Sequence, residues 1–233
     1  MKQSGGSNAQ KRRAGESAAD LVSDGDVVGL GTGSTAAAAI RALGRRVDSG
    51  LDIRGIATSY QSRQLAREVE IPLTTLEEAT PDIAIDGADQ VAGLEGGSSV
   101  DLIKGGGAAH AREKIVASAA ARFVIVADPT KLSERLDLPV PVEVLPDAVP
   151  VVEDELATLG GAPTLRAAEK KDGPVVTDNG NLVIDCEFGT ISDSKALAVE
   201  ISGFAGIVEH GLFVDMADEV YVGSDDGVDR YSL

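Results

Sequence analysis

A lysine followed by three glycines is the feature of this sequence with the clearest chemical meaning. Lys104 precedes glycines 105–107, and Glu113 follows within about two helical turns. Glycines let a backbone bend tightly and approach a ligand closely. Residues 108–121 read as a helix, whose first N–H groups suit an anionic oxygen. A fixed cation, N–H donors and a carboxylate base are what proton abstraction beside a carbonyl requires.

A second glycine-rich stretch lies at 31–35, between a predicted strand and a predicted helix. Its sequence is Gly31-Thr32-Gly33-Ser34-Thr35. Two glycines free the backbone and three hydroxyls can donate, so the loop suits a phosphate. With Ala36, the loop matches the loose dinucleotide-binding pattern G-x-G-x-x-G/A. The next predicted strand, however, ends without the acidic residue that binds a ribose hydroxyl in dinucleotide-binding proteins. No lysine follows the loop, so it is not a Walker P-loop. We expect a small phosphorylated ligand; a purely structural turn is the alternative.

Two carboxylates stand three residues apart after an apolar run, in Asp86-Gly87-Ala88-Asp89. Paired acids can divide roles, one moving a proton while the other orients. The plainer interpretation is that an Asp caps the next segment. Lys104 and Glu113 have plain alternatives too, as a solvated lysine and a surface Glu paired with a neighbouring cation. Lys131 follows another strand end and can reach the same pocket or be an ordinary loop lysine.

Composition limits the possible functions. The net charge is −17, from 38 acidic and 21 basic residues, which disfavours nucleic acid as a partner. A dense carboxylate surface repels itself unless salt screens it, so we expect a salt-loving source; an acidic mesophilic protein is the alternative. His110 and His210 lack metal-ligand spacing, and Cys186 reads as a core residue, so no metal site is expected. No signal peptide or membrane-spanning run is evident, and a cytoplasmic setting fits the single cysteine.

The elements that must position these residues alternate along the first part of the chain. Strands are predicted at 27–30, 53–57, 72–76, 83–85 and 123–127, helices at 11–22, 36–47, 62–70 and 108–121, and a frayed terminus at 1–10. Such alternation indicates a parallel α/β sheet, in which ligands bind beyond the carboxyl ends of the strands. The polar clusters all follow strand ends, so we expect them to meet.

The pattern changes near residue 136, where prolines become frequent. Strand, helix and strand are predicted at 142–146, 151–160 and 163–169, then a turn at 177–181, and strand, helix and strand at 182–188, 194–204 and 207–213. This β-α-β-β-α-β order is ferredoxin-like. In the turn, Asn179-Gly180 favours a primed hairpin. A last strand, 219–223, is expected to rejoin the first sheet, which makes the second region an insertion.

Taken in order, these motifs resemble those of the type A ribose-5-phosphate isomerases. The resemblance covers nearly the whole chain from about residue 11. It rests on G-T-G-S-T at 31–35, D-G-A-D at 86–89, K-G-G-G at 104–107, R-E-K-I at 112–115, Lys131, T-D-N-G-N at 177–181 and G-L-F at 211–213. It implies an α/β fold with a Rossmann-like large domain, 1–135 plus 208–233, and an inserted smaller ferredoxin-like α+β domain, 136–207.

The same resemblance implies roles for particular residues. Glu113 matches the base that moves a proton between C1 and C2, and Lys104 matches a group that stabilises the oxyanion of an enediolate. The loop 86–89 matches the loop that contacts the sugar hydroxyls in the family. The resemblance also implies that Asp86 or Asp89 assists ring opening. The implied substrate-binding set is Thr32, Gly33, Ser34, Thr35, Asp86, Gly87, Ala88, Asp89, Lys104, Gly105, Gly106, Gly107 and Lys131, with Lys11 as a further phosphate contact. The chain departs from the family at Gln90, at 110–111 and at 57–59, and none of these departures removes a charged role.

The implied activity is the interconversion of D-ribose 5-phosphate and D-ribulose 5-phosphate in the non-oxidative pentose phosphate pathway, without a cofactor or metal. The family suggests a homodimer or homotetramer, with no nucleic-acid or membrane partner. Two rivals stay open. One is an isomerase or deaminase of another sugar phosphate, such as an amino sugar. The other is a non-catalytic sugar-phosphate sensor, which would not need Glu113. Such a sensor is expected to carry a DNA-binding module, and the short polar start leaves no room for one.

Overall fold

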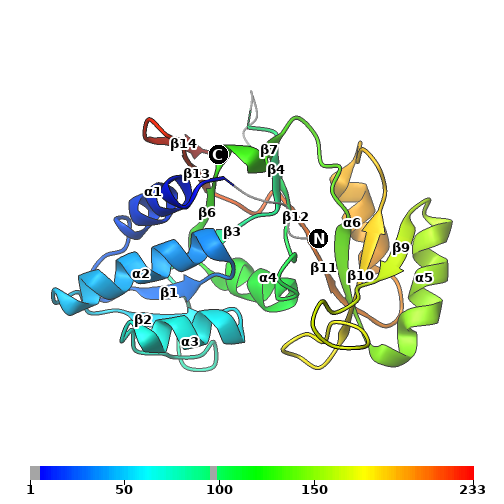
Figure 1. Ribbon diagram of the computed structural model, residues 1–233, viewed down its shortest axis with the longest axis horizontal. Helices are drawn as coiled ribbons and strands as arrows, with labels where there is room; N and C mark the ends of the chain where they lie inside the picture. Colours follow the sequence, from blue (N-terminus) through cyan, green and yellow to red (C-terminus); the bar gives the residue numbers. More distant parts are fainter. Residues whose placement is uncertain (1–5, 95–98) are drawn as a thin grey trace.

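The chain folds into two α/β regions that lie side by side, as a computed structural model of residues 6–94 and 99–233 shows (Figure 1). The first region is built on a six-stranded sheet in the order β14-β13-β6-β3-β1-β2. The strands β1, β2, β3, β6 and β13 are parallel, and β14 pairs antiparallel at the edge. Their bounds are Val27–Leu30 for β1, Arg54–Ala57 for β2, Ile83–Gly87 for β3, Phe123–Ala127 for β6, Glu219–Gly223 for β13 and Val228–Ser232 for β14.

Helices cover both faces of this sheet because the strands are apolar on both sides. The helices are α1 (Asn8–Ala19), α2 (Ser34–Asp48), α3 (Tyr60–Glu68) and α4 (His110–Ala119). One core cluster joins α1, α2 and α3 to the sheet, and a second cluster joins the opposite face to α4. Small side chains let α1 and α2 pack closely: a Cβ at Gly15 would collide with the backbone of Ala38 and Ala39. The core is made mostly of aliphatic side chains, as the shortage of aromatics requires, with Phe123, Phe213 and Tyr221 as its buried aromatic residues.

The strand order creates a crevice at the carboxyl edge of the sheet. From β1 the chain crosses through α2 to β2 on one side, whereas β3 and then β6 follow on the other side of β1. Ligands of open α/β sheets bind at such a switch point, beyond the carboxyl ends of the diverging strands. The loop 31–35 follows β1 and the loop 86–89 follows β3, so the fold brings the first two polar clusters together.

The second region is a four-stranded antiparallel sheet with two helices, which we call the ferredoxin-like unit (residues 140–210). Its elements are β8 (Val140–Val144), η2 (Pro146–Ala148), α5 (Val149–Thr158), β9 (Ala162–Leu165), β10 (Leu182–Glu187), α6 (Ser194–Ser202) and β11 (Ile207–His210). The sheet order β11-β8-β10-β9 and the β-α-β-β-α-β succession confirm the predicted pattern. The proposed domain limits, 1–135 plus 208–233 and 136–207, stay a prediction; β11 runs three residues beyond the second limit.

A small third sheet, in the order β12-β5-β4-β7, was not predicted from the sequence. It consists of β4 (Gln90–Ala92), β5 (Asp101–Ile103), β7 (Leu132–Ser133) and β12 (Leu212–Val214). Each strand has only two or three residues, which is too short for an alternating pattern to show. Its importance is local: β5 ends directly before Lys104 and so delivers this lysine to the crevice.

The structure corrects four expectations about local structure. Residues 72–76 form no strand and make only one bridge, between Leu73 and Gly55. The predicted strand 207–213 breaks at Gly211 into β11 and β12, in two different sheets. At the break, Gly211 is hydrogen-bonded to the backbone of Pro141 and Lys104, and it lies so close to Lys104 that a Cβ would collide with the carbonyl oxygen of that residue. The turn at 177–181 is not a primed hairpin: Gly180 has φ +87°, but Asn179 does not have a positive φ. Helix α1 already begins at Asn8, where the sequence suggested a frayed end.

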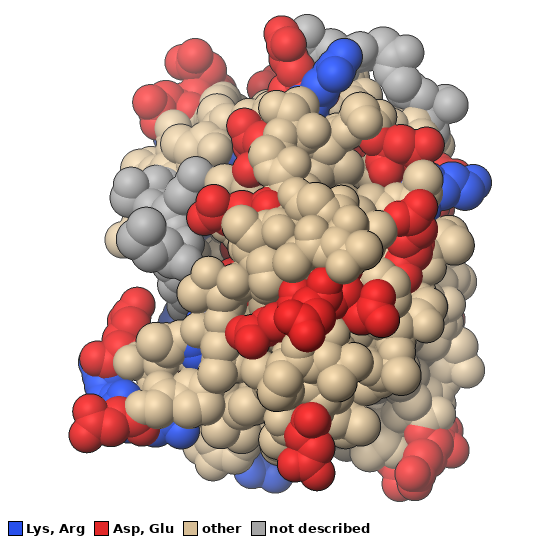
Figure 2. Space-filling view, turned by 90° about the vertical axis from the view of Figure 1, so that its right-hand side faces the viewer, with Lys and Arg blue, Asp and Glu red and all other residues tan. Residues whose placement is uncertain are grey.

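The acidic composition shows on the surface. Figure 2 shows the face on the right of Figure 1, where carboxylates are scattered over the molecule and Lys and Arg side chains are few. Within the described residues, no helix is both long enough and apolar enough to pass through a membrane.

Candidate active site

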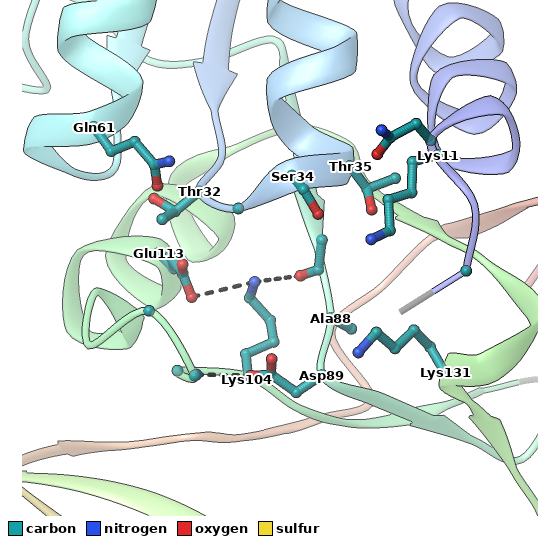
Figure 3. A pocket seen from close by; sticks show the side chains of 17 residues that line it. Lys11, Thr32, Ser34, Thr35, Gln61, Ala88, Asp89, Lys104, Glu113 and Lys131 are labelled. Atoms are coloured by element: carbon teal, nitrogen blue, oxygen red, sulfur yellow. Dashed lines mark hydrogen bonds and ion pairs between the residues drawn. The ribbon is translucent and has the colours of Figure 1, made fainter. Parts of the chain in front are cut away.

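A cavity of about 520 Å³ lies at the carboxyl edge of the six-stranded sheet (Figure 3). Its wall contains Thr32, Gly33, Ser34, Thr35, Gly87, Ala88, Asp89, Lys104, Gly105, Gly106, Gly107, Glu113 and Lys131. Lys11 also lines it. Of the residues predicted from the sequence, only Asp86 is absent from this wall; it is buried directly behind it. The structure therefore brings the four motifs together, although they span a hundred residues of sequence.

Lys104 is the electrostatic centre of the cavity. Its side chain is only 2 % exposed, and its Nζ lies 3.1 Å from Oδ2 of Asp86 and 3.2 Å from Oε2 of Glu113. The ammonium also donates to the carbonyl oxygen of Gly87. Figure 3 shows Lys104 pointing into the crevice with Glu113 facing it. One buried ammonium thus pairs with two buried carboxylates, so the three side chains together carry a net charge of −1 when both carboxylates are ionised.

This imbalance governs the protonation of the three groups. Burial raises the pKa of Glu113 to about 8; Lys104 opposes this rise and the charge of Asp86 adds to it. Burial also raises the pKa of Asp86 above its ordinary value, against the attraction of Lys104. Burial lowers the pKa of Lys104, but Asp86 and Glu113 together outweigh burial and raise it above the ordinary value. Lys104 therefore stays charged, while Glu113 can gain and lose a proton near neutral pH.

The two aspartates have different surroundings. Asp86 Oδ1 accepts from the backbone N–H groups of Thr32, at 2.9 Å, and Gly87, at 2.7 Å, so it ties the loop after β1 to the loop after β3. Asp89 lines the cavity, and its Oδ2 accepts from the N–H of Gly106 at 2.7 Å. That N–H is therefore already engaged, which reduces the set of backbone donors expected for a bound oxyanion.

The opposite end of the cavity is cationic. Lys11 comes from α1, and Lys131 comes from the short helix η1 (Pro129–Lys131), which Asp128 caps through a 3.0 Å bond from the N–H of Thr130. Figure 3 shows the ammonium of Lys11 beside Thr35 at the start of α2, and Lys131 reaching in from the same side of the cavity toward Ala88. Gly33, the N-cap of α2, has φ +103° and supplies no side-chain cap, so the first turn of α2 is left open to a ligand.

Several residues of the wall were not predicted. Gly6, Asn8 and Gln61 also line the cavity. The start of α1 carries a capping box, in which Ser7 and Gln10 bond reciprocally, and this S-x-x-Q signature is readable in the sequence. Gln61 follows the end of β2, so the strand-end rule that found the other loops would also have pointed to it.

The ferredoxin-like unit supports the segment 104–114 from behind. Nη1 of Arg166 donates to the carbonyl oxygen of Gly105 at 2.9 Å, and the same guanidinium is paired with Asp185. Nζ of Lys114 contacts Glu209 Oε1 at 2.6 Å and the carbonyl oxygen of His210 at 2.7 Å. Gly105, beside Lys104, is therefore anchored to Arg166, which directly follows β9, and Lys114, beside Glu113, is anchored to β11.

Comparison with known proteins identifies the family. The family model for ribose 5-phosphate isomerase A (phosphoriboisomerase A) matches residues 54–227. The chain belongs to the ribose 5-phosphate isomerase A family. A ribose-5-phosphate isomerase A from Natronomonas pharaonis is 74 % identical over 98 % of this chain and 99 % of that protein, and one from Methanosarcina acetivorans is 57 % identical over 94 % of this chain and 92 % of that protein.

Solved structures of ribose 5-phosphate isomerases share the whole fold. The enzyme from Methanocaldococcus jannaschii superposes with a TM-score of 0.91 at 45 % identity, covering 96 % of this chain and 98 % of that one. A D-ribose-5-phosphate isomerase in complex with phospho-erythronic acid has a TM-score of 0.92 at 40 % identity, with the same coverage. These comparisons confirm the family and the fold class expected from the motifs. The roles of individual residues stay proposals.

Proposed function

We propose that this protein interconverts D-ribose 5-phosphate and D-ribulose 5-phosphate, as its family name indicates. The observation that carries the proposal is the pairing of Glu113 with Lys104, 3.2 Å apart in the wall of a cavity whose other end is cationic. A base and a fixed cation at one end and a phosphate site at the other match a sugar phosphate whose reacting carbons are remote from its phosphate.

The phosphate is proposed to bind between Lys11, Lys131 and the open first turn of α2, where Ser34 and Thr35 supply hydroxyls. A helix N-terminus and two ammonium groups suit a doubly charged anion. The energy of this remote contact positions C1 and C2 at the other end of the cavity, next to Glu113.

Ring opening precedes isomerisation, because the furanose has no free carbonyl group. We assign this proton transfer to Asp89, since Asp89 lines the cavity whereas Asp86 lies behind it, bonded to two backbone N–H groups. Asp86 is instead assigned the positioning of Lys104, from which it is 3.1 Å away.

The ionised carboxylate of Glu113 then removes the proton from C2. The C2–H electron pair forms the C1–C2 double bond, and the carbonyl electron pair moves to O1, giving an enediolate. The ammonium of Lys104 stabilises this oxygen by about 3–4 kcal/mol, the size measured for oxyanion donors elsewhere. Glu113 returns its proton to C1, and the proton of the 2-hydroxyl is transferred to O1, so that C2 becomes the ketone. The proton taken from C2 stays on the carboxyl group of Glu113, where it can exchange with solvent before it is delivered to C1.

A direct assay tests the proposal. The purified protein is incubated with D-ribose 5-phosphate, and separately with D-ribulose 5-phosphate, in concentrated KCl. Both mixtures are expected to reach the same aldose–ketose ratio, and a reaction in D2O is expected to place deuterium on C1 of the ketose. An absence of interconversion from either side would refute the function.

Further properties follow from the same proposal. We infer an enzyme that works at high salt, because the chain carries 38 acidic against 21 basic residues. A cytoplasmic setting is also proposed, since the single cysteine allows no internal disulfide. A homodimer or homotetramer is also proposed, and exposed apolar side chains such as Ile115, Val151 and Val199 are candidates for subunit contacts. Light scattering at several KCl concentrations measures the mass; a monomer throughout would exclude the assembly.

A further inference from the structure

Glu143 is a fully buried carboxylate outside the cavity. It lies in β8, and its Oε1 accepts three hydrogen bonds, all from side chains of one surface turn. The donors are Oγ1 of Thr177 at 2.9 Å, Nδ2 of Asn179 at 3.0 Å and Nδ2 of Asn181 at 2.8 Å. Burying a carboxylate costs several kcal/mol unless such bonds compensate it. The protein therefore devotes an expensive group to the shape of the turn 177–181.

The backbone of the turn is fixed from within as well. The N–H of Thr177 donates to the carbonyl oxygen of Asn181 at 2.9 Å, and the N–H of Gly180 donates to that of Thr177 at 3.0 Å. Oγ1 of Thr177 also accepts from the N–H groups of Asn179 and Asn181, at 3.2 and 3.1 Å. The turn 177–181 is thus a stiff projection from the ferredoxin-like unit.

Its tip reaches the other region of the molecule. Oδ2 of Asp178 accepts from the N–H of Tyr60, the first residue of α3, at 2.6 Å. Oδ1 of Asn179 accepts from Nε of Arg112, in α4, at 2.8 Å. In Figure 1 the yellow loop before β10 extends toward α4. The turn therefore joins two helices of the first region that are far apart in sequence.

Both contacts stand next to residues of the cavity wall. Tyr60 precedes Gln61, and Arg112 precedes Glu113; Gln61 and Glu113 both line the cavity. Figure 3 shows these two side chains at the same end of the cavity, away from Lys11 and Lys131. The two contacts of the turn thus flank the end at which carbon chemistry is proposed.

We propose that the turn 177–181, shaped by Glu143, is a positioning clasp that fixes α3 and α4 and so keeps Glu113 aligned with Lys104 and the reacting carbons. The inference rests on the proposed isomerase function. Asp178 and Asn179 touch no substrate and act through the two helices. Misplacing a reacting group by 1 Å can cost about 10²-fold in rate, so a clasp at this place affects turnover rather than binding.

The test is the double variant Asp178→Ala/Asn179→Ala, which removes both contacts from an exposed turn together with one of the three hydrogen bonds to Glu143. We expect kcat to fall about 10- to 100-fold, while KM stays near the wild-type value because the phosphate end is untouched. Amide hydrogen exchange in α3 and α4 is expected to become faster. Asp226→Ala removes one exposed carboxylate elsewhere and serves as the matched control, with no change expected. Asp178→Asn keeps an acceptor for the N–H of Tyr60 and is expected to retain most of the activity.

Two results would overturn the clasp. One is a double variant with wild-type kcat and wild-type exchange in α4. The other is a lower melting temperature with unchanged kcat, which would make the turn a purely structural contact. If the wild type itself does not isomerise ribose 5-phosphate, the proposed function fails. The clasp is then still tested by comparing amide hydrogen exchange in α4 between the wild type and the double variant. Glu143→Gln is a second variant, expected to behave like the double variant; if it does not fold, the surface variants suffice.

Discussion

Replacing Lys104 by methionine removes the charge that holds the proposed site together and keeps most of the side-chain volume. The ammonium lies 3.1 Å from Asp86 and 3.2 Å from Glu113. At an effective dielectric constant of about 20, each contact is worth roughly 5 kcal/mol of Coulomb attraction. Burying the ammonium cancels part of this gain, so we expect a net loss of about 3–5 kcal/mol in unfolding free energy when one partner of such a buried group is removed.

The loss of stability in Lys104→Met is expected to depend on pH. Without the lysine, the pKa values of both buried carboxyls rise further above their ordinary values. A carboxyl group whose pKa is higher in the folded than in the unfolded state contributes fully to the stability of the protein below its unfolded pKa, near 4. That contribution is lost as the pH rises through the folded pKa. The deficit relative to wild type should therefore be small at pH 5 and larger at pH 8, and it should go on growing above pH 8, because Glu113 ionises in the wild type only near its pKa of about 8. Chemical denaturation at both pH values measures it.

Turnover provides the second readout for Lys104→Met. We expect kcat to fall about 10²- to 10³-fold, the cost of losing one oxyanion donor, with little change in KM. Lys195→Met, in an exposed position of α6, is the control. A variant of Lys104 that changes only KM would make this lysine a phosphate contact. A stability deficit that is equal at pH 5 and pH 8 would refute the electrostatic reasoning.

Three further outcomes are expected. Lys131→Ala should raise KM for ribose 5-phosphate about 10-fold, because it removes one charge-assisted hydrogen bond, and should affect kcat much less. Steady-state kinetics measure this, with the exposed Lys170→Ala as the control. The wild-type kcat/KM should rise with pH through a midpoint near 8, because Glu113, whose pKa burial raises to about 8, acts only when ionised; a flat profile from pH 6 to 9 would contradict the base assignment. The melting temperature should rise between 0.1 M and 2 M KCl, because salt shortens the Debye length from about 10 Å to 3 Å or less and screens the net charge of −17; calorimetry that shows no dependence on salt would end the halophilic interpretation.

The sequence was most informative where buried strands end in polar loops. The strands β1, β3 and β6 are short apolar runs, and their carboxyl ends had to share one edge of a parallel sheet. That single rule placed Thr32, Asp86 and Lys131 near one another. The β-α-β-β-α-β pattern of the ferredoxin-like unit was also readable, because prolines and a turn separate its strands and helices.

The features that the sequence did not reveal depend on contacts between distant segments. β4 and β5 have three residues each and owe their pairing to neighbours rather than to their own pattern. At Gly211, where the predicted strand breaks, the backbone of Lys104 passes close by, and no local signal in the sequence indicates this contact. Likewise, nothing in the turn 177–181 indicated that it would contact α3 and α4, because the partners lie 118 and 67 residues away.

The central claim is that Glu113 transfers the proton between C2 and C1, and Glu113→Gln tests it most directly. The amide keeps the shape of the side chain but cannot accept the proton. We expect kcat to fall about 10²- to 10⁴-fold, with the dissociation constant of ribose 5-phosphate unchanged and with the exchange of the C2 hydrogen into D2O lost. A Glu113→Gln protein that isomerises and exchanges at the wild-type rate would contradict the account.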